Sequence, residues 1–161
     1  MNEKYQNFII RDWQEEDREA AAGVIKAVLA EYGLPWQPKS ADRDVIEVES
    51  AYLKQGGEFW VVEQNGNIVG TAAYQPISRG QNAVEIRKMY LLSGVRGQGL
   101  GKYLLAQLEQ AIAIKDYQEI WLETASILKE AVELYELNGY VPADGVETQR
   151  CDLVYLKKLQ H

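Results

Sequence analysis

Glycines and basic residues are concentrated in one short segment of this chain, Arg96-Gly97-Gln98-Gly99-Leu100-Gly101-Lys102. An apolar run typical of a strand, 84–92, precedes it, and an amphipathic helical pattern begins near Leu100. Glycines let the main chain turn sharply and approach a ligand without interference from Cβ atoms. The free N–H groups and the positive dipole end of the following helix attract anions. The segment therefore predicts a main-chain cradle for a pyrophosphate.

Other glycine-rich phosphate loops have a different spacing. A Walker-type loop carries Ser or Thr after its lysine, whereas Tyr103 follows Lys102 here. The dinucleotide-binding fingerprint requires a third glycine at the position of Lys102. A connection that only turns the chain is the plain structural alternative, but the helix start and the basic residue at each end favour ligand binding. The spacing thus disfavours Mg-nucleotide hydrolysis and nicotinamide chemistry.

The Arg-x-x-Gly-x-Gly arrangement between a strand and a helix resembles the loop that holds the diphosphate of acetyl-coenzyme A in the GCN5-related N-acetyltransferase (GNAT) superfamily. A second segment, 131–140, reads Ala-Val-Glu-Leu-Tyr-Glu-Leu-Asn-Gly-Tyr and resembles the Ala-x-x-x-Tyr-x-x-x-Gly-Phe/Tyr signature of that superfamily. The separation between the two motifs also matches. The resemblance implies one N-acetyltransferase domain over residues 1–161. It also implies acetyl-coenzyme A as co-substrate and direct acetyl transfer to a primary amine of a small molecule or peptide.

Acyl transfer from a thioester to an amine needs a neutral amine, a donor to the developing oxyanion and a proton for the departing thiolate. The resemblance places Tyr135 near the coenzyme sulfur, where it would be the general acid. A phenol has a pKa of about 10 and stays protonated at neutral pH. The alternative is that Tyr135 is only the most polar residue on an apolar helix face, with its hydroxyl satisfied at the surface.

Two carboxylates compete for the role of general base. Glu85 resembles the strand glutamate that some superfamily members use through a water molecule, and Glu123 matches a position that other members use on the neighbouring strand. A buried carboxylate with a pKa raised toward neutrality would suit proton abstraction, whereas an exposed one paired with Arg87 or Lys88 would be a solubility feature. Glu85, Glu123 and a solvent or water-chain base all stay open.

The resemblance also assigns the coenzyme contacts. The pantetheine arm would lie as an added strand against main-chain groups of Met89, Tyr90 and Leu91, whose N–H groups would also polarise the thioester carbonyl. The diphosphate would contact main-chain N–H groups and the two terminal basic side chains of Arg96, Gly97, Gln98, Gly99, Leu100, Gly101 and Lys102. One departure lies at Leu128, because many members carry there an asparagine that contacts the coenzyme.

Two rival functions are compatible with these motifs. The first is a catalytically silent module that keeps the fold and the coenzyme cradle and acts as a sensor or an interaction domain. The second is an acyltransferase for longer acyl groups, which would differ only in the pocket beyond the thioester. Acceptor recognition in the superfamily lies in variable loops, so the sequence leaves the identity of the amine open.

Composition limits the class of protein. The chain has 161 residues, of which 47% are hydrophobic, enough for one domain with a substantial core. Its 17 basic and 24 acidic residues give a net charge of -7, which opposes binding to nucleic acids and anionic membranes. The N-terminus lacks a signal-peptide pattern and no long apolar run occurs, so we expect a cytoplasmic monomer or homodimer. A single cysteine, Cys151, and a single histidine, His161, predict neither a disulfide nor a metal site.

The elements that must position these residues follow from the apolar periodicity. Strand patterns occur at 8–11, 59–63, 68–74, 84–92, 120–124 and 149–159, and Asn65-Gly66 marks a hairpin. Helical patterns occur at 17–29, 45–53, 100–112 and 128–135. This order predicts an α/β protein with a single-domain GNAT-like fold, in which a mixed central β-sheet is flanked by helices on both faces.

Overall fold

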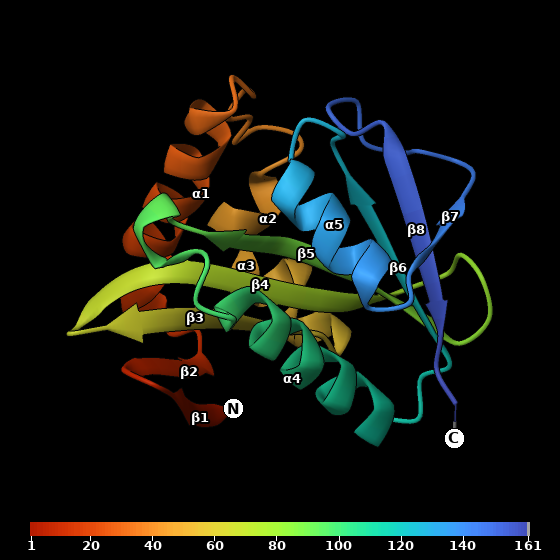
Figure 1. Cartoon of the computed structure of the whole chain (residues 1–161), viewed down its shortest axis with the longest axis horizontal. Coiled ribbons are helices and arrows are strands. Elements are labelled where there is room, and N and C mark those ends of the chain that lie inside the picture. Colours follow the sequence, from red (N-terminus) through yellow and green to blue (C-terminus); the bar gives the residue numbers. More distant parts are fainter. Residues whose placement is uncertain (161) are drawn as a thin grey trace.

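The strands of the computed structural model form one mixed sheet in the order β1-β2-β3-β4-β5-β6-β8-β7 (Figure 1). Neighbouring strands are antiparallel except β5 and β6, which are parallel. The structure describes residues 1–160, so the expectation for His161 lies outside the described residues. The strands are β1 (Asn2–Tyr5), β2 (Phe8–Asp12), β3 (Glu58–Gln64), β4 (Asn67–Ile77), β5 (Ala83–Leu91), β6 (Glu119–Thr124), β7 (Val141–Ala143) and β8 (Leu153–Lys158).

Helices cover both faces of the sheet, which confirms the predicted fold class (Figure 1). One face carries α1 (Arg18–Glu31), α2 (Arg43–Ile46) and α3 (Val48–Ala51), and the opposite face carries α4 (Leu100–Ile114) and α5 (Lys129–Leu137). Short 3-10 turns are η1 (Glu15–Asp17), η2 (Leu53–Gln55) and η3 (Ser93–Val95). Within residues 1–160, no helix combines the length and the apolar character needed to cross a membrane.

Alternating side chains along the strands build one apolar core on each face. In β3, Trp60 and Val62 pack in the core beneath α4, whereas Phe59 and Val61 pack in the core beneath α1. The apolar stripe of α4 is at most 1% exposed and consists of Leu100, Leu104, Leu105, Leu108 and Ile112. Full burial of such a side chain contributes about 1.5–3 kcal/mol. The stripe therefore fixes the helix whose first turn begins in the glycine segment.

The predicted helix over 45–53 is interrupted, and the structure has α2, α3 and η2 in its place. The main chain leaves the helical region at Glu47, with φ −112° and ψ 50°. Arg18 on α1 donates a hydrogen bond from Nη1 to the main-chain oxygen of Ile46 at 2.5 Å. The Ile46 carbonyl thus accepts a hydrogen bond from a side chain of α1, whereas in a continuous helix it would accept one from a main-chain N–H of the next turn.

Both edge strands lie outside the predicted elements. β1 has no alternation of apolar side chains, and it pairs with β2 through a turn in which Gln6 has a φ of 52°. β7 contains Pro142, a residue that sheets accept mainly at their edges. The last strand is also shorter than predicted, because residues 149–152 belong to the β7–β8 loop.

The parallel strands β5 and β6 diverge soon after they begin. Their registered pairs run only from Ala83 opposite Glu119 to Glu85 opposite Trp121. Beyond this point β6 continues to pair with β8, and β5 continues to pair with β4. The sheet therefore contains a gap between the second half of β5 and the second half of β6.

A bulge in β5 lies beside this gap. Arg87 pairs with Ala73 and Tyr90 pairs with Thr71, so Lys88 and one further residue lie opposite a single residue of β4. Lys88 has a φ of 51°, a left-handed conformation that is uncommon for a lysine. Thr71 donates from Oγ1 to the main-chain oxygen of Lys88 at 2.7 Å, which anchors the bulge. A bulge of this kind redirects the main chain toward a site at the strand edge.

Candidate active site

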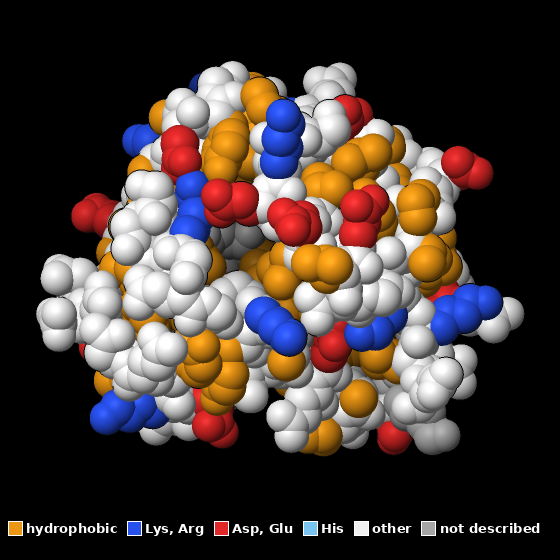
Figure 2. All heavy atoms as spheres, in the orientation of Figure 1, with side chains coloured by type: hydrophobic (Ala, Val, Ile, Leu, Met, Phe, Trp, Pro, Cys, Tyr) orange, Lys and Arg blue, Asp and Glu red, His pale blue; other side chains and the backbone are white. Residues whose placement is uncertain are grey.

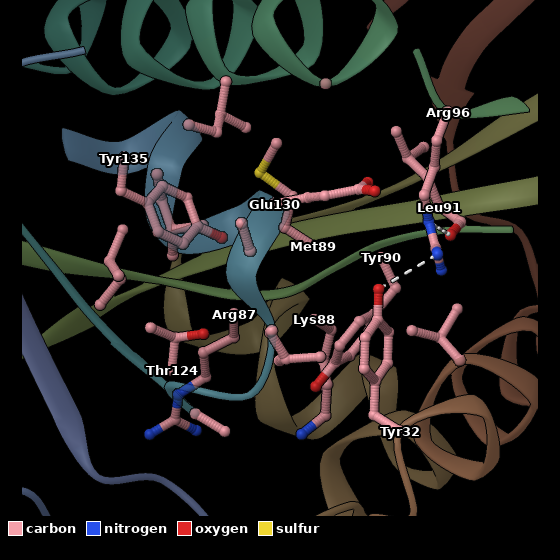
Figure 3. Close-up of a pocket in the computed structure, with 18 of the residues that line it drawn as sticks. Tyr32, Arg87, Lys88, Met89, Tyr90, Leu91, Arg96, Thr124, Glu130 and Tyr135 are labelled. Atoms are coloured by element: carbon pink, nitrogen blue, oxygen red, sulfur yellow. Dashed lines mark hydrogen bonds between the residues drawn. The ribbon is translucent and has the colours of Figure 1, made fainter. Parts of the chain in front are cut away.

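A cavity of about 320 Å³ occupies the gap between β5 and β6 (Figure 3). The molecular face seen in Figure 2 is hollowed near its centre. Five parts of the chain contribute side chains to the cavity: α1, the second half of β5, the glycine segment, the end of β6 with α5, and the β7–β8 loop. The residues that line the cavity include Arg87, Lys88, Met89, Tyr90, Leu91, Arg96, Gly97, Gly99, Gly101, Lys102, Glu123, Thr124, Leu128, Glu130, Tyr135, Arg150 and Cys151.

The glycine segment has the conformation expected of an anion cradle. Gly97 and Gly99 have φ values of 78° and 79°, and Gly99 is the N-cap of α4. A Cβ atom at Gly97 would meet nothing within 4 Å, so this part of the loop faces open space. The main-chain N–H groups of residues 97–102 donate to no acceptor among residues 1–160. These free N–H groups at a helix start can donate hydrogen bonds to the oxygens of a diphosphate.

The other residues of the segment have different surroundings. Lys102 is exposed and lines the cavity, where its charge can reach a phosphate. Arg96 instead braces the loop, since its Nε donates to the Leu91 oxygen at 2.9 Å and its Nη1 and Nη2 donate to Glu31 at 2.6 and 2.8 Å. Leu100 is 1% exposed and belongs to the core.

Tyr5 of β1 supports the same loop from the outside. Its ring stacks on Tyr103 with centroids 4.4 Å apart, and its hydroxyl donates to the main-chain oxygen of Gln98 at 3.0 Å. This hydrogen bond fixes the Gln98 carbonyl on the Tyr5 side of the loop, whereas the main-chain N–H of Gln98 has no acceptor among residues 1–160. The sequence did not indicate that Tyr5 supports this loop, because Tyr5 is a single tyrosine in a polar segment and its contacts are with residues far away in the chain.

Tyr135 is the buried residue of α5, with 6% of its surface exposed, and it lines the cavity. Its ring lies edge-on to Tyr140, with centroids 5.8 Å apart. In Figure 3 its hydroxyl points into the cavity, and it has no hydrogen-bond partner among residues 1–160. Burial is the main cause that raises the pKa of Tyr135, so the phenol stays protonated at neutral pH. The group can therefore donate a proton to a ligand atom in the cavity.

Glu85 lies on the α1 face of β5, and 6% of its surface is exposed. Burial raises the pKa of Glu85, and the neighbouring Arg87, which is hydrogen-bonded to it, partly opposes this effect. Glu85 does not itself line the cavity, whereas Arg87 does. A carboxylate in this position can accept a proton from the cavity only through a water molecule.

Glu123, on β6, lines the cavity but has its oxygens occupied. It accepts hydrogen bonds from the main-chain N–H groups of Glu147 (3.0 Å) and Thr148 (2.8 Å) and forms an ion pair with Arg79 at 3.2 Å. Arg79 also stacks over Trp121, 4.4 Å from the ring centroid. These contacts hold the β7–β8 loop against β6, a task that occupies the lone pairs a general base would use.

The main chain of β5 presents the remaining predicted coenzyme contacts. Met89, Tyr90 and Leu91 all line the cavity at the edge that β6 leaves unpaired. Burial raises the pKa of Tyr90 to about 12, so its hydroxyl is neutral. Leu128, where the superfamily often has asparagine, is 9% exposed and supplies an apolar surface to the cavity.

Cys151 also lines the cavity, but its environment does not activate it. Burial raises the pKa of its thiol to about 11, with a further upward contribution from Glu123. The thiolate, which is the nucleophilic form, is therefore scarce at neutral pH.

A buried ionic cluster, unforeseen from the sequence, closes the side of the cavity away from the glycine segment. Asp42 is 0% exposed and binds both Nη atoms of Arg150 at 2.6 and 2.5 Å. Lys88 Nζ lies 3.1 Å from Asp42 Oδ1 and 3.3 Å from Asp44 Oδ1. The main-chain N–H of Gln37 donates to Asp42 Oδ2 at 2.8 Å. The cluster joins the α1–α2 connection, the bulge of β5 and the β7–β8 loop.

The arrangement can be compared with known proteins. A model described as the Acetyltransferase (GNAT) family matches residues 11–140. The uncharacterized N-acetyltransferase YjgM of Escherichia coli (strain K12) is 37% identical over 143 residues, which cover 86% of this chain and 85% of that protein.

Solved structures share the fold of this chain. An acetyltransferase of the GNAT family from Staphylococcus aureus Mu50 has a TM-score of 0.88 at 22% identity, covering 95% of this chain and 99% of that chain. The PaiA N-acetyltransferase from Thermoplasma acidophilum, solved in complex with coenzyme A, has a TM-score of 0.73 at 19% identity, covering 94% of this chain and 99% of that chain.

The match over residues 11–140 includes β5, the glycine segment and α5, which carry the cavity. The similarity to YjgM extends over most of both chains. The resemblance inferred from the two motifs is confirmed. The chain belongs to the GNAT family of acetyltransferases.

Proposed function

We propose that this protein is an acetyl-coenzyme A-dependent N-acetyltransferase that moves the acetyl group directly to a primary amine of a small molecule or peptide. The observation that carries the proposal is the set of unpaired amides of residues 97–102 at one end of a cavity that continues along β5 to the bulge. Because Cys151 has a raised pKa, a covalent acyl-cysteine intermediate is disfavoured.

The residues present fit this co-substrate. The free amides of the glycine segment and the Lys102 side chain would bind the diphosphate, and the open edge of β5 at 89–91 would pair with the amides of the pantetheine arm. This arm would bring the thioester between the bulge and the Tyr135 hydroxyl. Apolar lining from Leu128 would exclude water from that region.

The proposal assigns one group of the protein to each requirement of acyl transfer: the oxyanion donor, the base and the acid. N–H groups in the segment 89–91 stabilise the charge that develops on the carbonyl oxygen while the amine nitrogen bonds to the carbonyl carbon. Glu85 takes the proton of the amine through a water molecule, since its raised pKa favours proton acceptance. Tyr135 gives its proton to the sulfur as the carbon–sulfur bond breaks, and solvent then reprotonates it. The occupied oxygens of Glu123 favour Glu85 as the base.

Calorimetry with purified protein tests the cradle. We expect acetyl-coenzyme A to bind, and we expect Gly97→Val to weaken binding at least ten-fold because the side chain enters the open loop and strains a φ of 78°. Gly66→Val is the matched control, because Gly66 has a φ of 81°, equally open surroundings and a place in the distant β3–β4 turn. Equal affinities for the two variants, or no heat with the unmodified protein, would contradict the proposed cradle.

Release of free coenzyme A thiol across a panel of amines tests the reaction. An N-acetyltransferase releases thiol at a rate that depends on the amine, above the rate of hydrolysis without acceptor. A catalytically silent coenzyme A-binding module would bind in calorimetry but release thiol at the no-acceptor rate with every amine. Substituting longer acyl-coenzyme A donors in the same assay measures acyl-chain preference.

Glu85→Gln is expected to lower kcat about ten-fold and to change the pH profile. A base must be deprotonated to act, and the raised pKa of Glu85 means that activity of the unmodified enzyme rises with pH through a value above 4.5. The Glu85→Gln variant should lose this rise of activity with pH. If the variant keeps its kcat and its activity still rises with pH as in the unmodified enzyme, the base is solvent or another group.

A further inference from the structure

Three cationic side chains line the cavity at the end away from the glycine segment: Arg87, Lys88 and Arg150. Their partner carboxylates, which are Glu85, Asp42 and Asp44, do not line it. The cations therefore lie between these carboxylates and the cavity. An acceptor entering this end would meet these cations before their partner carboxylates, although the chain as a whole is acidic.

Lys88 and Arg150 are committed to the protein. The side chain of Lys88 is 9% exposed and contacts Asp42, Asp44 and the main-chain oxygen of Ala41 at 2.9 Å. The side chain of Arg150 is 8% exposed, and both its Nη atoms bind Asp42. The charges of these two cations are balanced by Asp42 and Asp44, and their side chains have little freedom to bind a ligand.

Arg87 differs from both. Its side chain is 37% exposed and comes from β5 one residue before the bulge. Its Nε donates to Glu85, and its Nη1 donates to the Gln75 amide oxygen at 2.9 Å when that amide is oriented to donate to the Ala51 oxygen. Its Nη2 has no partner among residues 1–160. In Figure 3 the guanidinium lies beside Thr124, on the side of the cavity opposite Arg96.

Among the described residues, neither of the carboxylates that line the cavity forms an ion pair with Arg87. Glu123 is held by Arg79 and by the main-chain amides of Glu147 and Thr148. Glu130 lies near Met89, away from Arg87, in Figure 3. A free guanidinium N–H in a partly desolvated cavity is suited to bind a carboxylate oxygen.

We propose that the acceptor is an amine that also carries a carboxylate, as amino acids do, and that Arg87 binds this carboxylate through Nη2. The inference rests on the proposed acetyl transfer and names the substrate class of that site. Binding the carboxylate beside the bulge would place the amine of the same small molecule near the thioester and near Glu85. Arg87 would thus favour acceptors that carry a carboxylate over amines that lack one, such as polyamines.

Matched acceptor pairs test the proposal with the unmodified enzyme. Each pair consists of an amino acid and the amine that results from its decarboxylation, assayed by thiol release with acetyl-coenzyme A. For at least one pair we expect kcat/KM to be ten-fold or more higher for the amino acid. A panel of polyamines, aminoglycosides and peptides with free N-termini is assayed beside the pairs.

Substitution of Arg87 tests the residue. Arg87→Gln should lower kcat/KM for the preferred amino acid, mainly through KM, by a factor about ten-fold greater than for its decarboxylated partner, because loss of the guanidinium beside Glu85 affects both members of a pair but loss of the carboxylate contact affects only the amino acid. Arg87→Lys keeps the charge and should recover part of the loss. Arg43→Gln is the control, because it removes a charge from the exposed side of α2, where Arg43 pairs only with Glu47. Unchanged acetyl-coenzyme A affinity verifies that each variant is folded.

The outcomes separate this inference from the proposed function. If the decarboxylated amines, polyamines or other acceptors without a carboxylate react as well as or better than the amino acids, the carboxylate inference is wrong and acetyl transfer stands. An Arg87→Gln variant that lowers activity equally for both members of a pair would also overturn it. If no acceptor raises thiol release although acetyl-coenzyme A binds, the proposed function fails, and the inference fails with it.

Discussion

Asp42→Ala is expected to lower the free energy of unfolding by about 3–5 kcal/mol, the range for removing one partner of a buried ion pair. The reason is that Asp42 is fully buried and neutralises Arg150 and Lys88, whose side chains are 8% and 9% exposed. Without the carboxylate, Arg150 would lose its ion-pair partner and Lys88 would keep only Asp44, both in a poorly hydrated environment. Urea unfolding followed by circular dichroism measures the change.

The pH dependence gives this prediction a second test. Burial alone would raise the pKa of Asp42, but Arg150, Lys88 and the Gln37 amide together hold it below the usual 3.8. A lowered folded pKa means that the stabilisation is complete above about pH 4 and is lost as the pH falls through the folded value. The difference between the two proteins should therefore shrink below pH 4. Glu47→Ala, which removes an exposed i,i+4 partner of Arg43, should cost less than about 0.5 kcal/mol.

Tyr135→Phe is expected to lower kcat about 100-fold, the lower end of the contribution of a general acid. The change removes only the hydroxyl that points into the cavity, so the affinity for acetyl-coenzyme A should stay within two-fold. Steady-state kinetics with a reactive amine and calorimetry with acetyl-coenzyme A measure the two quantities separately.

Tyr155→Phe is the matched control for this change. Tyr155 is also buried, and its ring centroid lies 6.4 Å from that of Tyr135, but its hydroxyl donates to Glu136 at 2.9 Å. The control should keep its kcat. If both variants retain full turnover, Tyr135 has no role as an acid; if both lose it equally, the effect is structural.

Features carried by short stretches of sequence were predictable. The sharp turn of the glycine segment, where Gly97 and Gly99 have positive φ, was indicated by its glycines, and the position of Tyr135 on the buried face of α5 was indicated by its helical spacing. The β3–β4 hairpin follows from Asn65-Gly66, whose φ values are 52° and 81°. In each case local main-chain geometry determines the outcome.

Features that depend on distant contacts were not predictable. Asp42 and Arg150 are 108 residues apart in the chain, and neither has a neighbour that indicates an ion pair. Likewise, Glu85 and Glu123 are equivalent as strand glutamates, and only the folded chain surrounds Glu123 with amides and Arg79. Tertiary contacts therefore decide between candidates that periodicity treats alike.

The divergence of β5 and β6 has a consequence for the cohesion of the molecule. Because the pairing of β5 and β6 ends at Glu85 and Trp121, no strand pairing joins the two parts of the sheet across the gap beyond these residues. A ligand whose amides pair with the free edge of β5 would add hydrogen bonds across this gap. It would stabilise the folded sheet through its own binding free energy. Under the proposed function, protein without its acyl donor would be the form most open to local separation of the two parts of the sheet and to proteolysis.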